Sequence, residues 1–253
     1  MAVSYPADGN AVFCQLEDDS VWFRHRNRCI TAVVGQFPPA GPILDIGGGN
    51  GVVARALIDA GHPTSLLEPG AVGAANARQR RNIPDVINTT LEDAGLPQAS
   101  VAAAGLFDVV EHIQDDRGFV AELRDLLKPG GLVYVTVPAH QWLWSAADVD
   151  AGHYRRYSTG GLRALFESAG FEVQYATYFF EMLIVPLFLM RTLPSAIGVS
   201  KRLAASDYVE HAAGGRRLSA WLQALMAHEV RAIERQRTLM TGTSCLLVAR
   251  KPA

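Results

Sequence analysis

Residues 43–51 have the sequence Ile-Leu-Asp-Ile-Gly-Gly-Gly-Asn-Gly, in which a short apolar run reaches an acid, Asp45, and then a series of glycines. Gly47, Gly49 and Gly51 alternate with other residues, and a helix-forming segment, 52–60, follows them. Glycine has no Cβ, so a ligand can lie directly on the backbone, where the first N–H groups of a helix can bind it. The stretch therefore predicts a strand, a tight glycine turn and a helix start that bind a nucleotide-like ligand.

A second acid follows at a spacing typical of nucleotide-binding folds. Residues 64–68 read as a strand that ends at Glu68, whose carboxylate is well placed to accept hydrogen bonds from ribose hydroxyls. Enzymes that bind NAD share this acid, but their glycine spacing is G-x-G-x-x-G. Here the spacing is G-x-G-x-G, and Asp45 would repel a pyrophosphate and favour a cationic amino-acid group.

Four motifs in order resemble those of the class I S-adenosylmethionine-dependent methyltransferases. The first is the acid and glycines of 45–51, and the second is 88–97, where these enzymes usually hold the adenine. Residues 106–113 resemble the fourth-strand motif of ubiquinone-biosynthesis O-methyltransferases and related bacterial enzymes, and 126–138 resemble the Pro-Gly-Gly turn and fifth strand. One departure is the start of the fourth strand, where Val101-Ala102 replace the usual Phe-Asp.

The resemblance implies S-adenosylmethionine as the cofactor and S-adenosylhomocysteine as the product. The cofactor-binding residues that it implies are Asp45, Gly47, Gly49, Gly51, Glu68, Pro69, Leu91, Glu92 and Phe107. Two alternatives stay open: an NAD-dependent oxidoreductase on a similar sheet, and a non-catalytic methyltransferase-like partner subunit. The glycine spacing argues against the first, and the intact acids and glycines argue against the second.

Alternating segments predict an α/β fold, a Rossmann-like doubly wound sheet of seven mostly parallel strands. We expect four units. They are an N-terminal helical segment (1–41), a cofactor-binding core (42–178), a helical cap inserted before the last strand (179–242), and the last strand of the core (243–253). The expected strands after the first two are 86–89, 101–107, 132–137, 171–178 and 244–251. The expected helices are 18–37, 52–60, 71–80, 115–127, 159–169 and 216–237.

The region 138–157, after the predicted fifth strand, is the most promising for chemistry, because it combines two tryptophans with many ionisable groups. Its run 152–157, Gly-His-Tyr-Arg-Arg-Tyr, resembles a pattern of a bacterial subgroup of these methyltransferases whose substrates are mostly unassigned. We expect His153 to remove the acceptor's proton, and an arginine to hold an anionic acceptor group. The alternative is a structural His-Arg-Tyr network that pins this loop to the sheet.

Glu111 and His112 follow the predicted fourth strand, beside the expected position of methyl transfer. His112 is the second candidate base, and Glu111 is suited to holding the loop or the substrate. In some of the resembled enzymes this pair bears on metal or substrate, but no third ligand follows at an obvious spacing, so we predict no metal site. The remaining candidate acceptor-binding residues are Trp22, Arg26, His140, Trp144, Arg155, Arg156 and Tyr157.

Trp22 and Arg26 belong to the predicted N-terminal helix, in the aromatic and arginine-rich cluster 22–28. Family members often have a similar helix packed over the mouth of the cofactor site. The alternative is an ordinary amphipathic helix in which Trp22 anchors the core.

The segment 179–242 is too long for a connection without structure of its own. Its uninterrupted apolar run, Met182 to Met190, has nine residues, far fewer than the roughly 20 that a bilayer span needs. We expect it to cover a hydrophobic acceptor, to form a homodimer contact or to touch a membrane surface peripherally. Apolar residues at helical spacing in 216–237 predict a helix that packs on the first one.

Composition limits the class of protein. A net charge of −2 gives no global attraction to nucleic acid, and three isolated cysteines predict a reducing cytoplasm rather than a disulfide framework. The N-terminus lacks the pattern of a secretory signal. The sequence therefore predicts methyl transfer in the cytoplasm to a small-molecule or lipid-like acceptor, with oxygen as the favoured acceptor atom.

Overall fold

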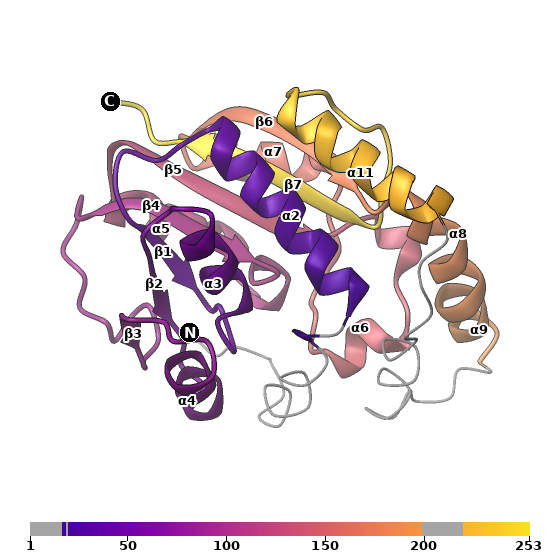
Figure 1. The fold of residues 1–253 in the computed structure, drawn as a ribbon, viewed down its shortest axis with the longest axis horizontal. Helices are drawn as coiled ribbons and strands as arrows, with labels where there is room; N and C mark the ends of the chain where they lie inside the picture. The colour runs from indigo at the N-terminus through magenta and orange to yellow at the C-terminus, as the bar shows by residue number, and fades with distance from the viewer. Residues whose placement is uncertain (1–16, 19, 199–219) are drawn as a thin grey trace.

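The computed structural model describes residues 17–18, 20–198 and 220–253, and the predictions for 1–16 and 199–219 lie outside that part. The strands are β1 (Ile43–Ile46), β2 (Thr64–Leu67), β3 (Val86–Ile87), β4 (Val101–Phe107), β5 (Leu127–Pro138), β6 (Glu172–Phe179) and β7 (Ser244–Arg250). They form one seven-stranded sheet in the order β3-β2-β1-β4-β5-β7-β6 (Figure 1). Strands β1 to β5 are parallel, and β7 is antiparallel to both β5 and β6. The predicted Rossmann-like, mostly parallel sheet is confirmed.

Helices cover both faces of this sheet. The longer ones are α2 (Val21–Gln36), α3 (Val52–Asp59), α4 (Ala71–Gln79), α5 (Asp116–Leu126), α7 (Thr159–Ser168) and α11 (Ala220–Glu234). Short helical turns are η1 (Val110–His112), η2 (Gln141–Leu143), α6 (Ala146–Asp150), η3 (Glu181–Leu183), α8 (Ile184–Leu187), η4 (Phe188–Thr192) and α9 (Leu193–Ala196). Apolar residues of α5 and α7 pack on one face, and those of α2, α3 and α11 pack on the other.

Two strands differ from their predicted bounds by more than one residue at an end. β5 starts at Leu127 rather than at Leu132, because Leu127 already pairs with Val101 and the register then shifts so that Leu132 pairs with Ala103. The Pro-Gly-Gly turn is the irregularity inside this strand, and Gly130 allows it with φ +76°. β3 ends at Ile87, and the side chain of the next residue, Asn88, donates to the carbonyls of Glu68 and Pro69.

The cap packs on the N-terminal helix, as its apolar spacing predicted. α11 lies beside α2 (Figure 1). The contact contains a buried polar pair, in which His25 Nε2 lies 2.6 Å from Glu229 Oε2. The Glu229 carboxylate also accepts the backbone N–H groups of Phe180 and Glu181, at 3.0 and 2.8 Å. One side chain therefore joins the two helices to the end of β6. Among the described residues, no helix is long and apolar enough to cross a bilayer.

Candidate active site

The turn after β1 has the conformation that its glycines predict. Gly47, Gly49 and Gly51 have φ values of +70°, +55° and +77°, in the left-handed region that favours glycine. Gly51 is the N-cap of α3, so the N–H groups of the first helical turn follow the glycines directly. The turn therefore offers backbone donors beside the carboxyl end of β1.

Gly48 is also required by the packing, although the motif treats it as a free position. A Cβ there would lie 2.3 Å from Leu66 Cδ1 and 2.5 Å from Asp45 Oδ2. We expect Gly48→Ala to lower the free energy of unfolding by about 1–3 kcal/mol, because the added methyl group overpacks the site. Thermal unfolding checks this. The matched control is Gly35→Ala in α2, where a Cβ meets nothing within 4 Å, and equal melting temperatures for the two variants would contradict the prediction.

Asp45 is a buried acid beside this turn, with none of its surface exposed. Neither carboxylate oxygen accepts a hydrogen bond of normal geometry from the described residues. Burial raises the pKa of Asp45 to about 7; the charge of Arg26 lowers the pKa in part, the charge of Glu68 raises it, and the N–H of Ala54 lowers it slightly. A buried carboxylate without partners is costly, so this site is suited to a cationic ligand.

Glu68 connects the glycine turn to the helix after β2. Its Oε2 accepts the N–H of Gly49 at 2.9 Å, and its Oε1 accepts the N–H of Gly70 at 2.7 Å. Asn88 Nδ2 supports this segment by donating to the carbonyls of Glu68 and Pro69, at 2.8 and 3.1 Å. Each oxygen of the Glu68 carboxylate therefore binds one backbone N–H, and the side chain joins the glycine turn to the segment after β2.

The other predicted cofactor residues differ in their surroundings. Pro69 and Glu92 are exposed, and Leu91 is partly buried against the core. The Phe107 side chain is buried in the core shared by α2, α3 and α11. Asp108 comes next, with φ +60°, and the sequence reasoning did not select it.

Asp108 and Arg26 bring α2 to the same edge of the sheet. Arg26 Nη1 lies 2.5 Å from Asp108 Oδ2, and Thr136 Oγ1 donates to Asp108 Oδ1 at 3.2 Å. The Arg26 guanidinium also lies 5.0 Å from the ring centroid of Trp22, whose ring stacks on Phe180. Arg26 therefore lies at the predicted site with an internal partner, and Trp22 serves as an anchor between α2 and the cap.

Glu111, His112 and His153 come together at the ends of β4 and β5. Glu111 is fully buried, its oxygens have no hydrogen-bond partner among the described residues, and burial and the charge of Asp108 raise its pKa well above the ordinary value. Burial and the nearby His153 lower the pKa of His112 to about 4. The rings of His112 and His153 are 4.7 Å apart, edge to face.

These three side chains offer ligand atoms within 4.8 Å of one another. Two imidazoles and a carboxylate are a donor set that a divalent metal could use. The sequence did not reveal this grouping, because His153 lies on the loop after β5 and reaches η1 only in the folded protein.

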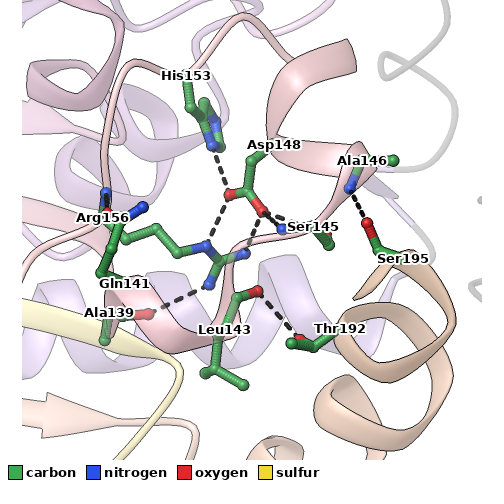
Figure 2. A network of polar contacts seen from close by, with 10 residues as sticks. All are labelled: Ala139, Gln141, Leu143, Ser145, Ala146, Asp148, His153, Arg156, Thr192 and Ser195. Carbon is green, nitrogen blue, oxygen red and sulfur yellow. Dashed lines mark hydrogen bonds and ion pairs between the residues drawn. The ribbon is translucent and has the colours of Figure 1, made fainter. Parts of the chain in front are cut away.

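Asp148 holds the loop that carries His153 (Figure 2). Its Oδ1 lies 3.0 Å from His153 Nδ1 and accepts Arg156 Nε at 2.7 Å, and its Oδ2 accepts Arg156 Nη2 at 3.0 Å. The Ser145 N–H donates to Oδ2 at 2.9 Å. Burial alone would raise the pKa of Asp148, but the hydrogen bonds and charges of His153 and Arg156 outweigh it and hold the pKa at about 2. The Ser-x-x-Asp spacing of a capping box was the available sequence signal.

The two arginines and Tyr157 have partners inside the protein. Arg156 also donates to the carbonyl of Ala139 at 3.2 Å. Arg155 pairs with Asp116 at 2.6 Å, and the buried Tyr157 hydroxyl donates to the same carboxylate at 2.8 Å. This arrangement fits the alternative in which the run 152–157 pins the loop to the sheet.

His140 and Trp144 lie at the start of that loop. Trp144 is half-buried, and His140 has φ +61° and stacks on Tyr178 at 4.7 Å. His140, Arg156 and Tyr157 line a cavity of about 510 Å³ between the loop, α5 and α7. None of the predicted cofactor residues lines this cavity.

Comparison with known proteins shows which family and which relatives this chain is similar to. A family described as "Methyltransferase domain" matches residues 18–176. A relative from Mycolicibacterium smegmatis, named a probable S-adenosylmethionine-dependent methyltransferase, is 29% identical over 171 residues, 67% of this chain and 66% of the relative. A ubiquinone biosynthesis O-methyltransferase of Cereibacter sphaeroides is 34% identical over 104 residues, 36% of this chain and 38% of that protein. The chain thus spans less than two thirds of the length of these relatives.

Solved structures share the fold at low sequence identity. A chain from the complex between the Haloferax volcanii Trm112 methyltransferase activator and "the putative methyltransferase" has a TM-score of 0.63 and 17% identity, covering 100% of this chain and 98% of that one. Haemonchus contortus phosphoethanolamine N-methyltransferase 2, solved with S-adenosyl-L-methionine, has a TM-score of 0.58 and 17% identity, covering 99% of this chain and 58% of that one.

Proposed function

Because the chain belongs to the methyltransferase domain family, we propose that it transfers the methyl group of S-adenosylmethionine to an oxygen atom of a small-molecule or lipid-like acceptor. The family membership confirms the resemblance to class I methyltransferases, and S-adenosylmethionine is the cofactor of those enzymes. The observation that carries the proposal is Asp45, a buried carboxylate that accepts no hydrogen bond of normal geometry from the described residues and lies beside three left-handed glycines.

The residues at the carboxyl ends of β1 and β2 fit the cofactor. Asp45 would pair with its cationic amino-acid group, and the glycine turn would let it approach the backbone. Glu68 would accept hydrogen bonds from the ribose hydroxyls. The cofactor supplies an electrophilic methyl group on a sulfonium, so the protein needs to position an acceptor and exclude water rather than provide a nucleophile.

An oxygen acceptor must lose a proton, and we assign that step to His153. A base works best when its conjugate acid has a pKa near the working pH, and the low pKa of His112 makes it a weak base. Asp148 would accept the Nδ1–H of His153 and leave Nε2 free to take the acceptor's proton. The buried carboxylate would also stabilise the imidazolium that forms.

Oxygen as the acceptor atom is supported by the similarity to the ubiquinone biosynthesis O-methyltransferase. The remaining candidate is a non-catalytic partner subunit, since one structural neighbour was solved with an activator protein. The cofactor residues are intact in this chain, which favours the enzyme.

The test combines calorimetry with a product assay. Titration with S-adenosylmethionine should release heat with one site per chain, and NAD should give none. Formation of S-adenosylhomocysteine is then measured with a panel of hydroxyl-bearing acceptors, with and without a chelator, because Glu111, His112 and His153 could bind a metal. Binding of NAD alone would overturn the proposal. Cofactor binding without product, together with a stable complex with another enzyme, would favour the partner subunit.

A further inference from the structure

Three side chains of different chemistry meet between α2 and α11, which lie side by side (Figure 1). His25 and Cys29 are one helical turn apart on α2, and Glu229 comes from α11. Their exposed fractions are 1%, 0% and 2%. One ligand atom from each, an imidazole nitrogen, a sulfur and a carboxylate oxygen, lies within 4.8 Å of the other two. Imidazole, thiolate and carboxylate are the three protein ligands of zinc.

We propose that His25, Cys29 and Glu229 bind one zinc ion that joins α2 to the cap. His25 Nε2 lies 2.6 Å from Glu229 Oε2 and 3.6 Å from Cys29 Sγ. A hydrogen atom between the nitrogen and the oxygen satisfies those two atoms and leaves the sulfur out. A cation among the three atoms would instead accept a lone pair from each of them.

The distances between these atoms are close to those of a zinc site. Zinc bonds of about 2.0 Å to nitrogen or oxygen and about 2.3 Å to sulfur, in tetrahedral directions, put ligand atoms about 3.3–3.5 Å apart. The nitrogen–sulfur distance of 3.6 Å already fits. The nitrogen–oxygen distance of 2.6 Å must open by about 0.7 Å. Only a small side-chain movement is therefore needed.

Hydrogen bonds already fix the orientation of the carboxylate. The backbone N–H groups of Phe180 and Glu181 donate to Glu229 Oε2 and Oε1, at 3.0 and 2.8 Å. Hydrogen bonds to the ligands orient them and are part of a metal site. The Phe180 ring also lies 5.1 Å from that of His25, edge to face, so the surroundings are apolar.

Charge favours zinc among the divalent ions. Thiolate and carboxylate each carry one negative charge, so Zn²⁺ makes the site neutral overall, which suits a buried position. Magnesium and calcium prefer oxygen ligands alone, whereas zinc accepts sulfur and nitrogen. Burial and the charge of Glu229 raise the pKa of the Cys29 thiol well above its ordinary value. Zinc binding would therefore release the thiol proton.

The sequence did not reveal this grouping, because His25 and Glu229 are 204 residues apart. Only the spacing of four residues between His25 and Cys29 could be read along the chain. The ion would strengthen the contact between α2 and the cap, and α2 carries Arg26 at the candidate site. Zinc binding itself does not depend on the proposed function.

The experiment incubates the full chain with Zn²⁺, removes free ion by gel filtration and measures bound zinc, and then repeats the binding with Co²⁺. We expect bound zinc, and with cobalt a thiolate-to-cobalt charge-transfer band, which requires a cysteine ligand. Cys29→Ser should lose the band and weaken zinc binding by at least about tenfold. The matched control is Cys245→Ser, at a cysteine that is equally buried and outside this grouping, and it should keep the band.

Two further measurements support the first. Zinc should raise the melting temperature of the original chain and of Cys245→Ser, but not that of Cys29→Ser, because it would bind the folded state. Glu229→Gln keeps an oxygen for the backbone N–H groups and removes the charge, so it should also weaken zinc binding. This second variant keeps the inference testable if Cys29→Ser does not fold.

Three outcomes would overturn the inference. They are a chain that retains no zinc, a cobalt complex without the charge-transfer band, and a band that persists in Cys29→Ser. Metal bound by Glu111, His112 and His153 gives the second outcome, because that grouping has no cysteine. Cofactor affinity is measured on the same samples, so a chain that binds S-adenosylmethionine but shows no band overturns only this inference. A chain that shows the band but binds no cofactor overturns only the proposed function.

Discussion

Asp45→Asn is expected to weaken binding of S-adenosylmethionine by about 2–5 kcal/mol, because it removes the buried charge that would pair with the cationic cofactor. Calorimetry with both proteins at pH 8 measures the loss. Asp59→Asn is the matched control, since Asp59 is an exposed acid on α3 that pairs with Arg55. Unchanged affinity in Asp45→Asn would remove the main support for the proposed site.

The same variant should be more stable than the original protein when no cofactor is bound. Folding raises the pKa of Asp45 from 3.8 to about 7, so ionised Asp45 destabilises the folded protein. This loss of stability is absent below pH 3.8, the pKa of Asp45 in the unfolded chain. It grows as the pH rises towards 7 and is complete above pH 7. After subtracting the cost of burying an amide, we expect a gain of about 1–3 kcal/mol at pH 8 and little gain at pH 4. Thermal unfolding at the two pH values checks the sign.

Cofactor affinity should depend on pH for the same reason. Below pH 7 the free protein holds a proton on Asp45 that must leave before a cation can pair with it. Affinity of the original protein should therefore rise by up to about tenfold per pH unit between pH 5 and 7, and then level off. The Asn variant should show no such rise.

His153→Ala is expected to lower kcat about a hundredfold or more while leaving the affinity for S-adenosylmethionine unchanged, because the acceptor loses its base. Added imidazole should restore part of the rate, which it would not do if His153 only supported the loop. His112→Ala should have the smaller effect on kcat, because its imidazole is already a weak base in the folded protein.

Asp148→Asn tests the contribution of the Asp148 charge to catalysis while His153 is kept. The variant keeps the size of the side chain but removes the negative charge that orients and stabilises His153, so kcat should fall while the cofactor affinity is unchanged. Because Arg156 also binds Asp148, the melting temperature is measured in parallel. An unchanged rate in both His153→Ala and Asp148→Asn would reduce this network to a structural role.

Local patterns were sufficient to predict the fold. The apolar run before Asp45, the alternating glycines and the acid at Glu68 each act within a few residues, so they could be read along the chain. The clearest error in a predicted strand bound lies where a contact between distant residues determines the backbone conformation. At Leu127, pairing with Val101 makes β5 begin earlier in the chain than predicted.

The candidate site could be predicted only in part, because its polar contacts join distant segments. Arg26 and Asp108 are 82 residues apart, and neither residue alone indicates the pair. Asp148 looked like one acid among several in a polar loop, and only the structure shows it between His153 and Arg156. The need for glycine at position 48 depends on Leu66, on the neighbouring strand.

The position of β7 between β5 and β6 has a consequence for how the protein is made. A nascent chain cannot close the sheet until residue 250 has left the ribosome, because β7 supplies the hydrogen-bonding partner of both neighbours. Until then the apolar strands β5 and β6 expose open edges that other chains can pair with. Truncations before Ser244 are therefore expected to aggregate during synthesis rather than to yield a smaller folded domain.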